Sequence, residues 1–127
     1  PLAPAPQEMP MQPAPSSAGF VFAVAPRRRE EFRQYAANTA RIFRKHGALS
    51  VVECWGDDVP EGKLTSFPMA VQRQADETVV FAWITWPSKD ARTRGMQAVM
   101  EDPESPKEMP FDGKRLIYGG FELLVSA

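Results

Sequence analysis

The sequence predicts an α+β fold of the ferredoxin-like type, in which a four-stranded antiparallel sheet carries two helices on one face. Apolar segments of strand length alternate with two amphipathic segments in the order β-α-β-β-α-β. Right-handed crossovers turn that order into such a sheet. A further observation concerns assembly: the clearest strand candidate is apolar on both faces, whereas a sheet with one face in water should alternate apolar and polar residues.

Residues 1–18 differ from the rest of the chain. They hold six of the thirteen prolines, mixed with Ala, Gln and Ser, and their few apolar residues follow no period. Such a segment cannot bury enough apolar surface to offset its loss of conformational entropy. We therefore expect a flexible proline-rich arm at residues 1–18, without the features of a signal peptide, and a single domain at residues 19–127.

The domain is expected to begin with a strand and a helix. The segment GFVFAVA at residues 19–25 is rich in branched and aromatic side chains, which is typical of a strand. From residue 27 to residue 46, less polar residues recur at steps of three and four, which predicts an amphipathic helix. Gly47 follows at the position where a left-handed residue often ends a helix.

The remaining elements follow in order. Strands are expected at residues 48–56 and 78–86. Between them we expect a turn at DDVPEG, a short strand at KLTSF and an exposed linker at residues 67–77. Ser88 is a good N-cap for a second helix at residues 89–101. A tight turn at Asp112-Gly113 leads to the last strand at residues 114–125, in which Gly119-Gly120 indicates a bulge or a close backbone approach.

Composition excludes several classes of function. Fifteen Lys and Arg oppose sixteen Asp and Glu, so the net charge of −1 offers no electrostatic footprint for nucleic acid or an anionic membrane. No apolar run approaches the ~20 residues that span a bilayer. The single histidine, His46, argues against a multi-histidine metal site, and the single cysteine, Cys54, excludes an internal disulfide. We therefore expect no metal, cofactor, nucleic acid or membrane partner.

The strand at residues 78–86 predicts that the domain has a partner. Both of its faces are apolar, with Val79, Phe81 and Trp83 on one and Val80, Ala82, Ile84 and Trp86 on the other. Two helices cover only one face of the sheet, and monomers rarely leave a large apolar face in water. We therefore expect the second face to pack on that of another copy, which gives a homodimeric α/β barrel.

Three blocks of the sequence resemble a known family. ECWGDDVPEGK (residues 53–63), VVFAWITWPSK (residues 79–89) and MPFDGKRLIYGGFE (residues 109–122) are long and rich in Trp, Gly and Pro. From about residue 19 to its end, the chain resembles the YbaA-like family of small bacterial proteins. The resemblance implies a dimeric α/β barrel of ferredoxin-like fold and a cytoplasmic location. It brings no established activity, cofactor or catalytic residue.

Glu53 is the candidate catalytic residue. It lies inside the strand at residues 48–56, on the apolar face that it shares with Trp55. If that face lines the barrel, desolvation raises the pKa of Glu53 and suits its carboxyl to proton transfer. Cys54, on the opposite face, is then expected to be buried against the helices. The alternative role for Glu53 is an ion pair with an Arg or Lys, for example across the dimer.

The candidates for a ligand pocket are aromatic or basic: Trp55, Phe81, Trp83, Trp86, Tyr118, His46 and Arg115. The aromatic side chains suit a pocket for a small organic molecule and equally suit the dimer core, so both interpretations remain open. His46 is a candidate general base or haem ligand, although helix capping is the more common role. Arg115 follows a tight turn, where it either holds an anionic group or stays solvated.

The expected function is that of a homodimeric α/β barrel that binds or transforms a small organic molecule in a cavity between its sheets. The alternative is a non-enzymatic small-molecule-binding or stress-associated protein whose aromatic residues serve assembly. Dimeric barrels host unrelated chemistries, so the fold does not decide between these hypotheses. A cavity that reaches Glu53 and a second polar group favours an enzyme, whereas a cavity plugged by Trp and Phe favours assembly.

Overall fold

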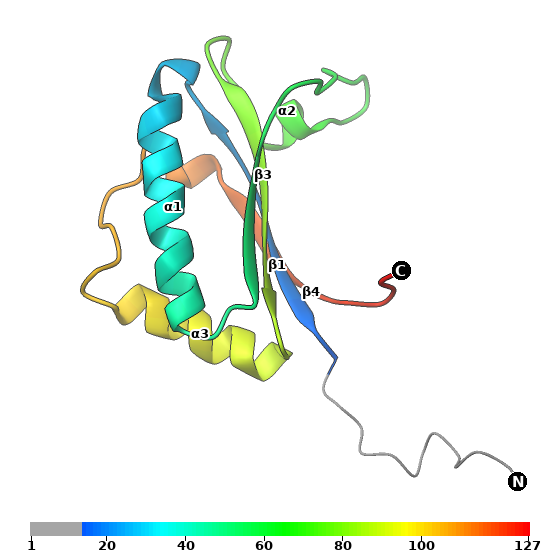
Figure 1. The fold of residues 1–127 in the computed structure, drawn as a ribbon. Helices are drawn as coiled ribbons and strands as arrows, with labels where there is room; N and C mark the ends of the chain where they lie inside the picture. Colours follow the sequence, from blue (N-terminus) through cyan, green and yellow to red (C-terminus); the bar gives the residue numbers. More distant parts are fainter. Residues whose placement is uncertain (1–13) are drawn as a thin grey trace, which may run out of the picture.

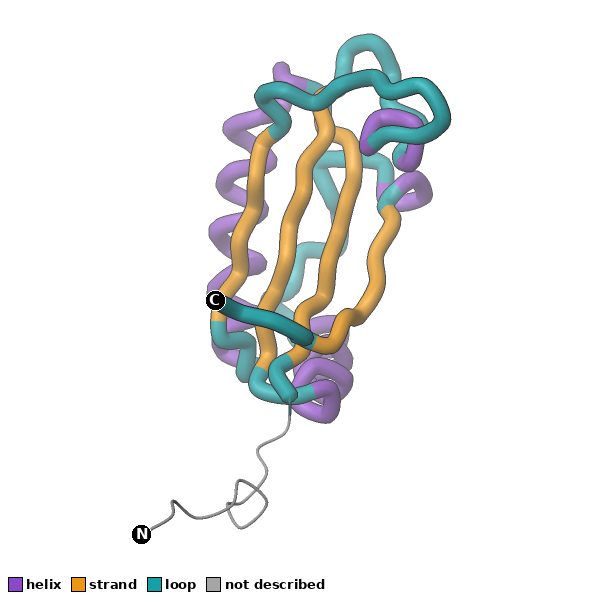
Figure 2. Tube along the Cα trace, turned by 90° about the vertical axis from the view of Figure 1, so that its right-hand side faces the viewer, coloured by secondary structure: helices purple, strands orange, loops and turns teal. Residues whose placement is uncertain are grey.

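The computed structural model describes residues 14–127, which form a four-stranded antiparallel sheet between two unequal layers (Figure 1). The strands lie in the spatial order β2-β3-β1-β4 and are β1 (Ser16–Val24), β2 (Ser50–Trp55), β3 (Thr78–Trp86) and β4 (Ile117–Glu122). The helices are α1 (Arg29–Lys45), α2 (Phe67–Ala70) and α3 (Lys89–Glu101). α1 and α3 cover one face of the sheet, as predicted, and α2 lies on the other side (Figures 1 and 2).

The face under α1 and α3 holds the main core. Phe22 of β1 and Val80 of β3 pack against Phe32 of α1. Trp86 at the end of β3 is 0% exposed, and a Cβ on Gly95 of α3 would overlap its ring. Gly95 therefore lets α3 approach the sheet closely.

Local sequence sets the bounds of α1 and α3. The Ser88 hydroxyl accepts a hydrogen bond of 3.0 Å from the Ala91 N–H and so caps α3, whose bounds match the prediction. Gly47, just after α1, has a φ of +106°, a conformation that side-chain-bearing residues rarely adopt. The α1 helix starts later than predicted, because residues Pro26–Arg28 form a 3₁₀ turn.

The two ends of the sheet also differ from the prediction. β1 begins at Ser16, which is 3% exposed. Residues 16–18 therefore belong to the sheet and not to the arm. Of the other predicted arm residues, 14 and 15 precede the strand, and residues 1–13 lie outside the described part of the chain. β4 is shorter than predicted, because residues 113–115 form a 3₁₀ turn in which Asp112 caps the Lys114 N–H at 3.0 Å. The register of β4 on β1 runs without a break through Gly119-Gly120, so the predicted bulge is absent from this pairing.

The connection between β2 and β3 departs most from the prediction. The segment KLTSF forms no strand, residues 67–70 form α2, and Val71 is 0% exposed. Val71 packs with Val21, Ala23 and Val79 on the face opposite α1 and α3. The expected exposed linker therefore covers part of the second face of the sheet, because its short apolar segment precedes the polar stretch that suggested exposure.

Candidate functional site

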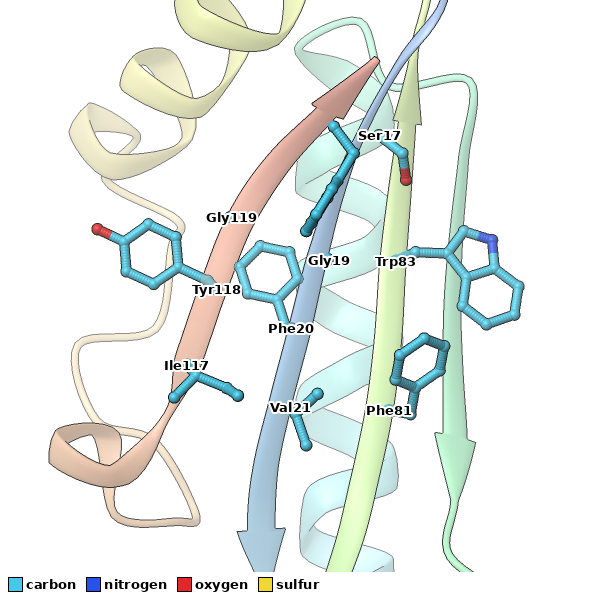
Figure 3. A pocket seen from close by; sticks show the side chains of 10 residues that line it. Ser17, Gly19, Phe20, Val21, Phe81, Trp83, Ile117, Tyr118 and Gly119 are labelled. Atoms are coloured by element: carbon cyan, nitrogen blue, oxygen red, sulfur yellow. The ribbon is translucent and has the colours of Figure 1, made fainter. Parts of the chain in front are cut away.

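The loops around α2 leave part of the second face of the sheet uncovered (Figure 2). The side chains of this part form an apolar groove, which we call the sheet groove (Figure 3). Its volume is about 470 Å³. It is lined by Gly19 of β1, Phe81 and Trp83 of β3, and Ile117, Gly119 and Phe121 of β4. Ser17 lies at one end of the groove and adds a hydroxyl to this lining. The groove is thus suited to apolar groups.

Two glycines form the floor of the sheet groove. Gly19 and Gly119 are direct partners across β1 and β4, and Gly19 is also the partner of Trp83 on β3. The Phe121 ring lies over both glycines, 3.3 Å and 3.5 Å from where their Cβ atoms would stand. The floor is therefore flat backbone, and an aromatic ring already rests on it.

The walls of the groove are exposed apolar side chains. Phe81, Ile117 and Phe121 are 42%, 44% and 60% exposed. Residues 123–127 leave β4 and project from the same side of the sheet (Figure 1), with Leu124 91% exposed. Monomeric proteins rarely leave so many large apolar side chains of one surface in water. This surface is the strongest indication of a binding function in the molecule.

The structure separates the predicted aromatic candidates. Phe81 and Trp83 line the groove, with ring centroids 5.6 Å apart. Trp55 and Trp86 lie on the opposite face: the Trp55 ring is 6.2 Å from that of Phe32, and Trp86 is in the core. Tyr118 stacks on Phe20 at 6.3 Å and points out beyond the edge of the sheet (Figure 3). The sequence separates Phe81 and Trp83 from Trp86 by alternation along β3, but it does not tell which face the helices cover.

Glu53 lies on the helix-covered face, and the face assignment predicted for β2 is wrong. Glu53 pairs with Ala82 of the main core, whereas Cys54 pairs with Phe81 of the open face and is exposed rather than buried. β2 is an edge strand, and Glu53 as a whole residue is exposed to solvent there. Its carboxyl is nonetheless desolvated, which raises the pKa of Glu53 to about 7. Burial, with a smaller contribution from the Glu53 charge, raises the pKa of Tyr35.

The sheet groove and Glu53 are therefore on opposite sides of the sheet. Among the described residues, Glu53 makes no salt bridge and no side-chain hydrogen bond that would fix the carboxyl. The expected ion pair is thus absent within this part of the chain. A proton-transfer role for Glu53 stays a prediction, and it would belong to the helix-covered side of β2 rather than to the groove.

His46 is tied to a buried aspartate. Its Nε2 lies 2.6 Å from Asp102 Oδ2, and Lys45 Nζ donates to the same oxygen at 2.9 Å. The side chain of Asp102 is 3% exposed, and its other oxygen accepts from the Glu104 N–H at 2.9 Å. The hydrogen bond from His46, then those from Lys45 and Glu104, lower the pKa of Asp102. His46 therefore joins the end of α1 to the loop after α3.

Arg115 is held by carboxylates of the chain itself. Its guanidinium forms two parallel hydrogen bonds of 2.7 Å with Glu77 and a further one of 3.0 Å with Asp112. The side chains of Arg115 and Glu77 are 15% and 11% exposed. This fork joins the loop before β3 to the turn before β4, which leaves little of Arg115 for an external anion.

The prediction missed Gly19, Ile117, Gly119 and Phe121 as groove residues. Glycines inside strands are a usable signal, because they often mark a hollow or a close approach of another group. Their meaning here depends on register: Gly19 and Gly119 make a floor only because β1 and β4 place them opposite each other. Register across one hundred residues of chain is not readable from composition or period.

Within residues 14–127, no three His, Cys, Asp or Glu side chains gather in a way that could hold a metal ion. None of the helices in this part of the chain combines the length and the apolar character that crossing a membrane requires.

Comparison with known proteins identifies relatives along nearly the whole domain. Residues 17–113 match the model of a family described as "Protein of unknown function (DUF1428)". The chain is 50% identical to "Uncharacterized protein YbaA" of Escherichia coli K12 over 110 residues, which cover 84% of this chain and 94% of the relative. The protein of the same name from Shigella flexneri matches with the same identity and coverage. The expected family resemblance is confirmed: the chain belongs to the DUF1428 family, together with YbaA.

Proposed function

We propose that this protein binds a small, largely apolar organic molecule in the sheet groove, between the open faces of two copies of the chain. The observation that carries the proposal is the groove itself. It offers about 470 Å³ over a glycine floor, with aromatic walls on a face that α1 and α3 do not cover. Ligand sites are typically apolar hollows of several hundred Å³ with few polar groups.

A second copy of the chain is the proposed cover. Its open face is identical, so a twofold axis can bring the same patch of both copies together, and stable dimers bury roughly 800 Å² per partner. The exposed side chains of β3, β4 and residues 123–125 supply apolar surface for such contact. Covering them on both copies would also close the groove from water.

Binding without catalysis is favoured over an enzymatic function. The polar side chains that the groove meets are those of Ser17 and, at its rim, Tyr118, and neither is a strong acid or base at neutral pH. Glu53, the candidate proton donor, is on the other face. Catalysis in the groove would need a carboxylate, an imidazole or an amine, and none of these lines it among the described residues.

The position of Phe121 favours a second hypothesis, in which the aromatic residues serve assembly alone. Its ring already covers the floor at Gly19 and Gly119, and a partner's side chains could fill the remaining space. The two hypotheses share the dimer and differ in whether an interior space remains.

Sedimentation velocity and a fluorescent probe test both hypotheses. At micromolar concentration we expect a dimer that binds the uncharged probe N-phenyl-1-naphthylamine. Gly119→Val fills the floor, and we expect it to keep the dimer and weaken probe binding at least about tenfold. Met100→Ser is the control, because Met100 is an exposed apolar side chain of α3 that does not line the groove.

Each outcome decides a part of the proposal. A wild-type dimer without probe binding supports assembly alone. A stable, folded wild-type monomer at these concentrations contradicts the dimer. Probe binding that Gly119→Val leaves unchanged places the bound molecule outside the groove.

A further inference from the structure

A second cavity lies on the opposite side of the sheet, between the N-terminal half of α3 and the helix-facing side of β4. We call it the α3-β4 cleft; its volume is about 740 Å³, and Ser16, Lys89, Arg92, Gly120 and Glu122 are among its lining residues. We propose that this cleft binds an organic molecule through an anionic group, a carboxylate or a phosphate, held by the guanidinium of Arg92.

Arg92 differs from the other arginines of the described chain. Seven of them form ion pairs with Asp or Glu, and Arg29 lies over the Trp55 ring. Of the two that remain, Arg44 is exposed, whereas Arg92 is half-buried. No salt bridge joins Arg92 to a carboxylate within residues 14–127, although desolvated guanidinium groups are normally paired. Its charge is thus left for an external anion.

The fold fixes the position of the Arg92 guanidinium. Its Nη1 donates a 2.7 Å hydrogen bond to the Ser16 hydroxyl, and Ser16 is 3% exposed and in turn donates to the Phe121 carbonyl at 3.3 Å. On the other side the guanidinium lies against Gly120, where a Cβ would overlap it. An arginine that its own fold already orders loses less entropy when it binds, so its remaining N–H groups are well prepared for an oxyanion.

The charges around Arg92 favour an anion on the α3 side of the cleft and not on its β4 side. Lys89 adds a second cation, and the first turn of α3 adds the positive end of the helix dipole. Arg94 and Asp90 also line the cleft but neutralise each other through an ion pair of 2.7 Å. Glu122, opposite Ser16 in the register, repels an anion that approaches from the β4 side.

The size of the cleft indicates the class of ligand. Its volume far exceeds that of an inorganic ion, so the anionic group belongs to a larger molecule. Arginine pairs with planar carboxylates and with phosphates in the same two-pronged way, so both remain candidates for this group.

Nuclear magnetic resonance titration of the full chain tests the inference. Sodium acetate and sodium phosphate are added separately at constant ionic strength, up to about 50 mM, because single-group contacts are weak. We expect backbone amide shifts at Lys89, Arg92 and Gly120, and the anion with the stronger binding identifies the group. Arg92→Gln should weaken binding about tenfold, and Arg44→Gln, an equal charge change on an exposed arginine, should leave it unchanged.

Two further variants separate a built site from general attraction. Gly120→Ala keeps every charge but displaces the guanidinium, so we expect binding to weaken at least about threefold. Glu122→Gln removes the repelling charge, so we expect binding to strengthen. Equal losses in Arg92→Gln and Arg44→Gln, no effect of Gly120→Ala, or no shifts with either anion would each overturn the inference.

Discussion

The two faces of the sheet are built on opposite principles, although the same strands supply both. In the core under α1 and α3, neighbouring side chains pack closely, as where Gly95 admits the Trp86 ring. On the open face, Gly19 and Gly119 have no side chains, so a hollow remains between the aromatic rings around them. The chain itself thus covers most of one face, and we propose that a further molecule covers the other. Mutations on the two faces should therefore report different properties.

The largest expected effect is a difference in the free energy of unfolding between variants of two tryptophans of β3. Trp86→Ala should lower the free energy of unfolding by roughly 3–5 kcal/mol, because it empties a fully buried site. Trp83→Ala, on the open face, should cost less than half as much, and its cost should depend on protein concentration if a second copy covers it. Urea unfolding at two protein concentrations measures both. Equal, concentration-independent losses would contradict the distinction between the faces.

The next effect concerns the loop that covers part of the open face. Arg115→Ala should lower the free energy of unfolding by roughly 3 kcal/mol, because it leaves the little-exposed Glu77 carboxylate without its cation. Arg27→Ala is the control: its ion pair with Asp76 is exposed, so its loss should cost at most about 1 kcal/mol. Urea unfolding compares the two. Similar costs would show that the Glu77–Arg115 fork does not anchor the loop.

The hydrogen bonds of His46 and Lys45 to Asp102 should make the stability of the fold depend on pH. The pKa of Asp102 is lower in the folded chain than its ordinary value of about 4, so the folded state gains stability from its ionised form. That gain is complete above about pH 4 and is lost as the pH falls below it. We expect Asp102→Asn to lower the melting temperature by several degrees at pH 7 and the gap from wild type to narrow below pH 4. Asp90→Asn, which breaks an exposed pair, should show no such narrowing.

The smallest expected effect has the opposite sign. The pKa of Glu53 is raised from 4.5 to about 7. Its ionised form therefore destabilises the fold increasingly as the pH rises from about 4.5 to about 7. Glu53→Gln should therefore be more stable than wild type at pH 8 and equal to it at pH 4. Because solvent reaches part of the side chain, the gain should stay below about 1 kcal/mol. Thermal unfolding at the two pH values measures it, and a loss of stability at pH 8 would indicate a partner for Glu53.

Sequence predicts the elements of this protein better than the roles of their faces. β3 and α3 have local signals at both ends, since Pro87 and Ser88 separate an apolar strand from an amphipathic helix. The face of β2 has no such signal. Its alternation shows that Glu53 and Cys54 lie on different faces, but a period of two does not tell which face the helices cover. The more apolar of the two is the helix-covered core side, and Glu53 is tolerated there because β2 is at the edge.

The candidate site was predictable in kind and not in detail. Apolar residues on both faces of β3 indicate an open face, and Phe81 and Trp83 do lie there. The covering role of Val71 was not predictable, because the apolar segment that contains it is too short to show a period. The floor of the groove required the pairing of two glycines that are distant in the chain.

The indole nitrogen of Trp86 has less than 1 Å² of exposed surface, and none of the described residues accepts a hydrogen bond from it. Its proton meets water only when the surrounding core opens. The rate of its exchange with deuterium therefore measures how often that opening occurs. The indole of Trp83 lies on the open face, and its proton should exchange fast unless another molecule covers it. One spectrum of exchanging indole protons would thus time the opening of the domain and the covering of the groove in the same sample.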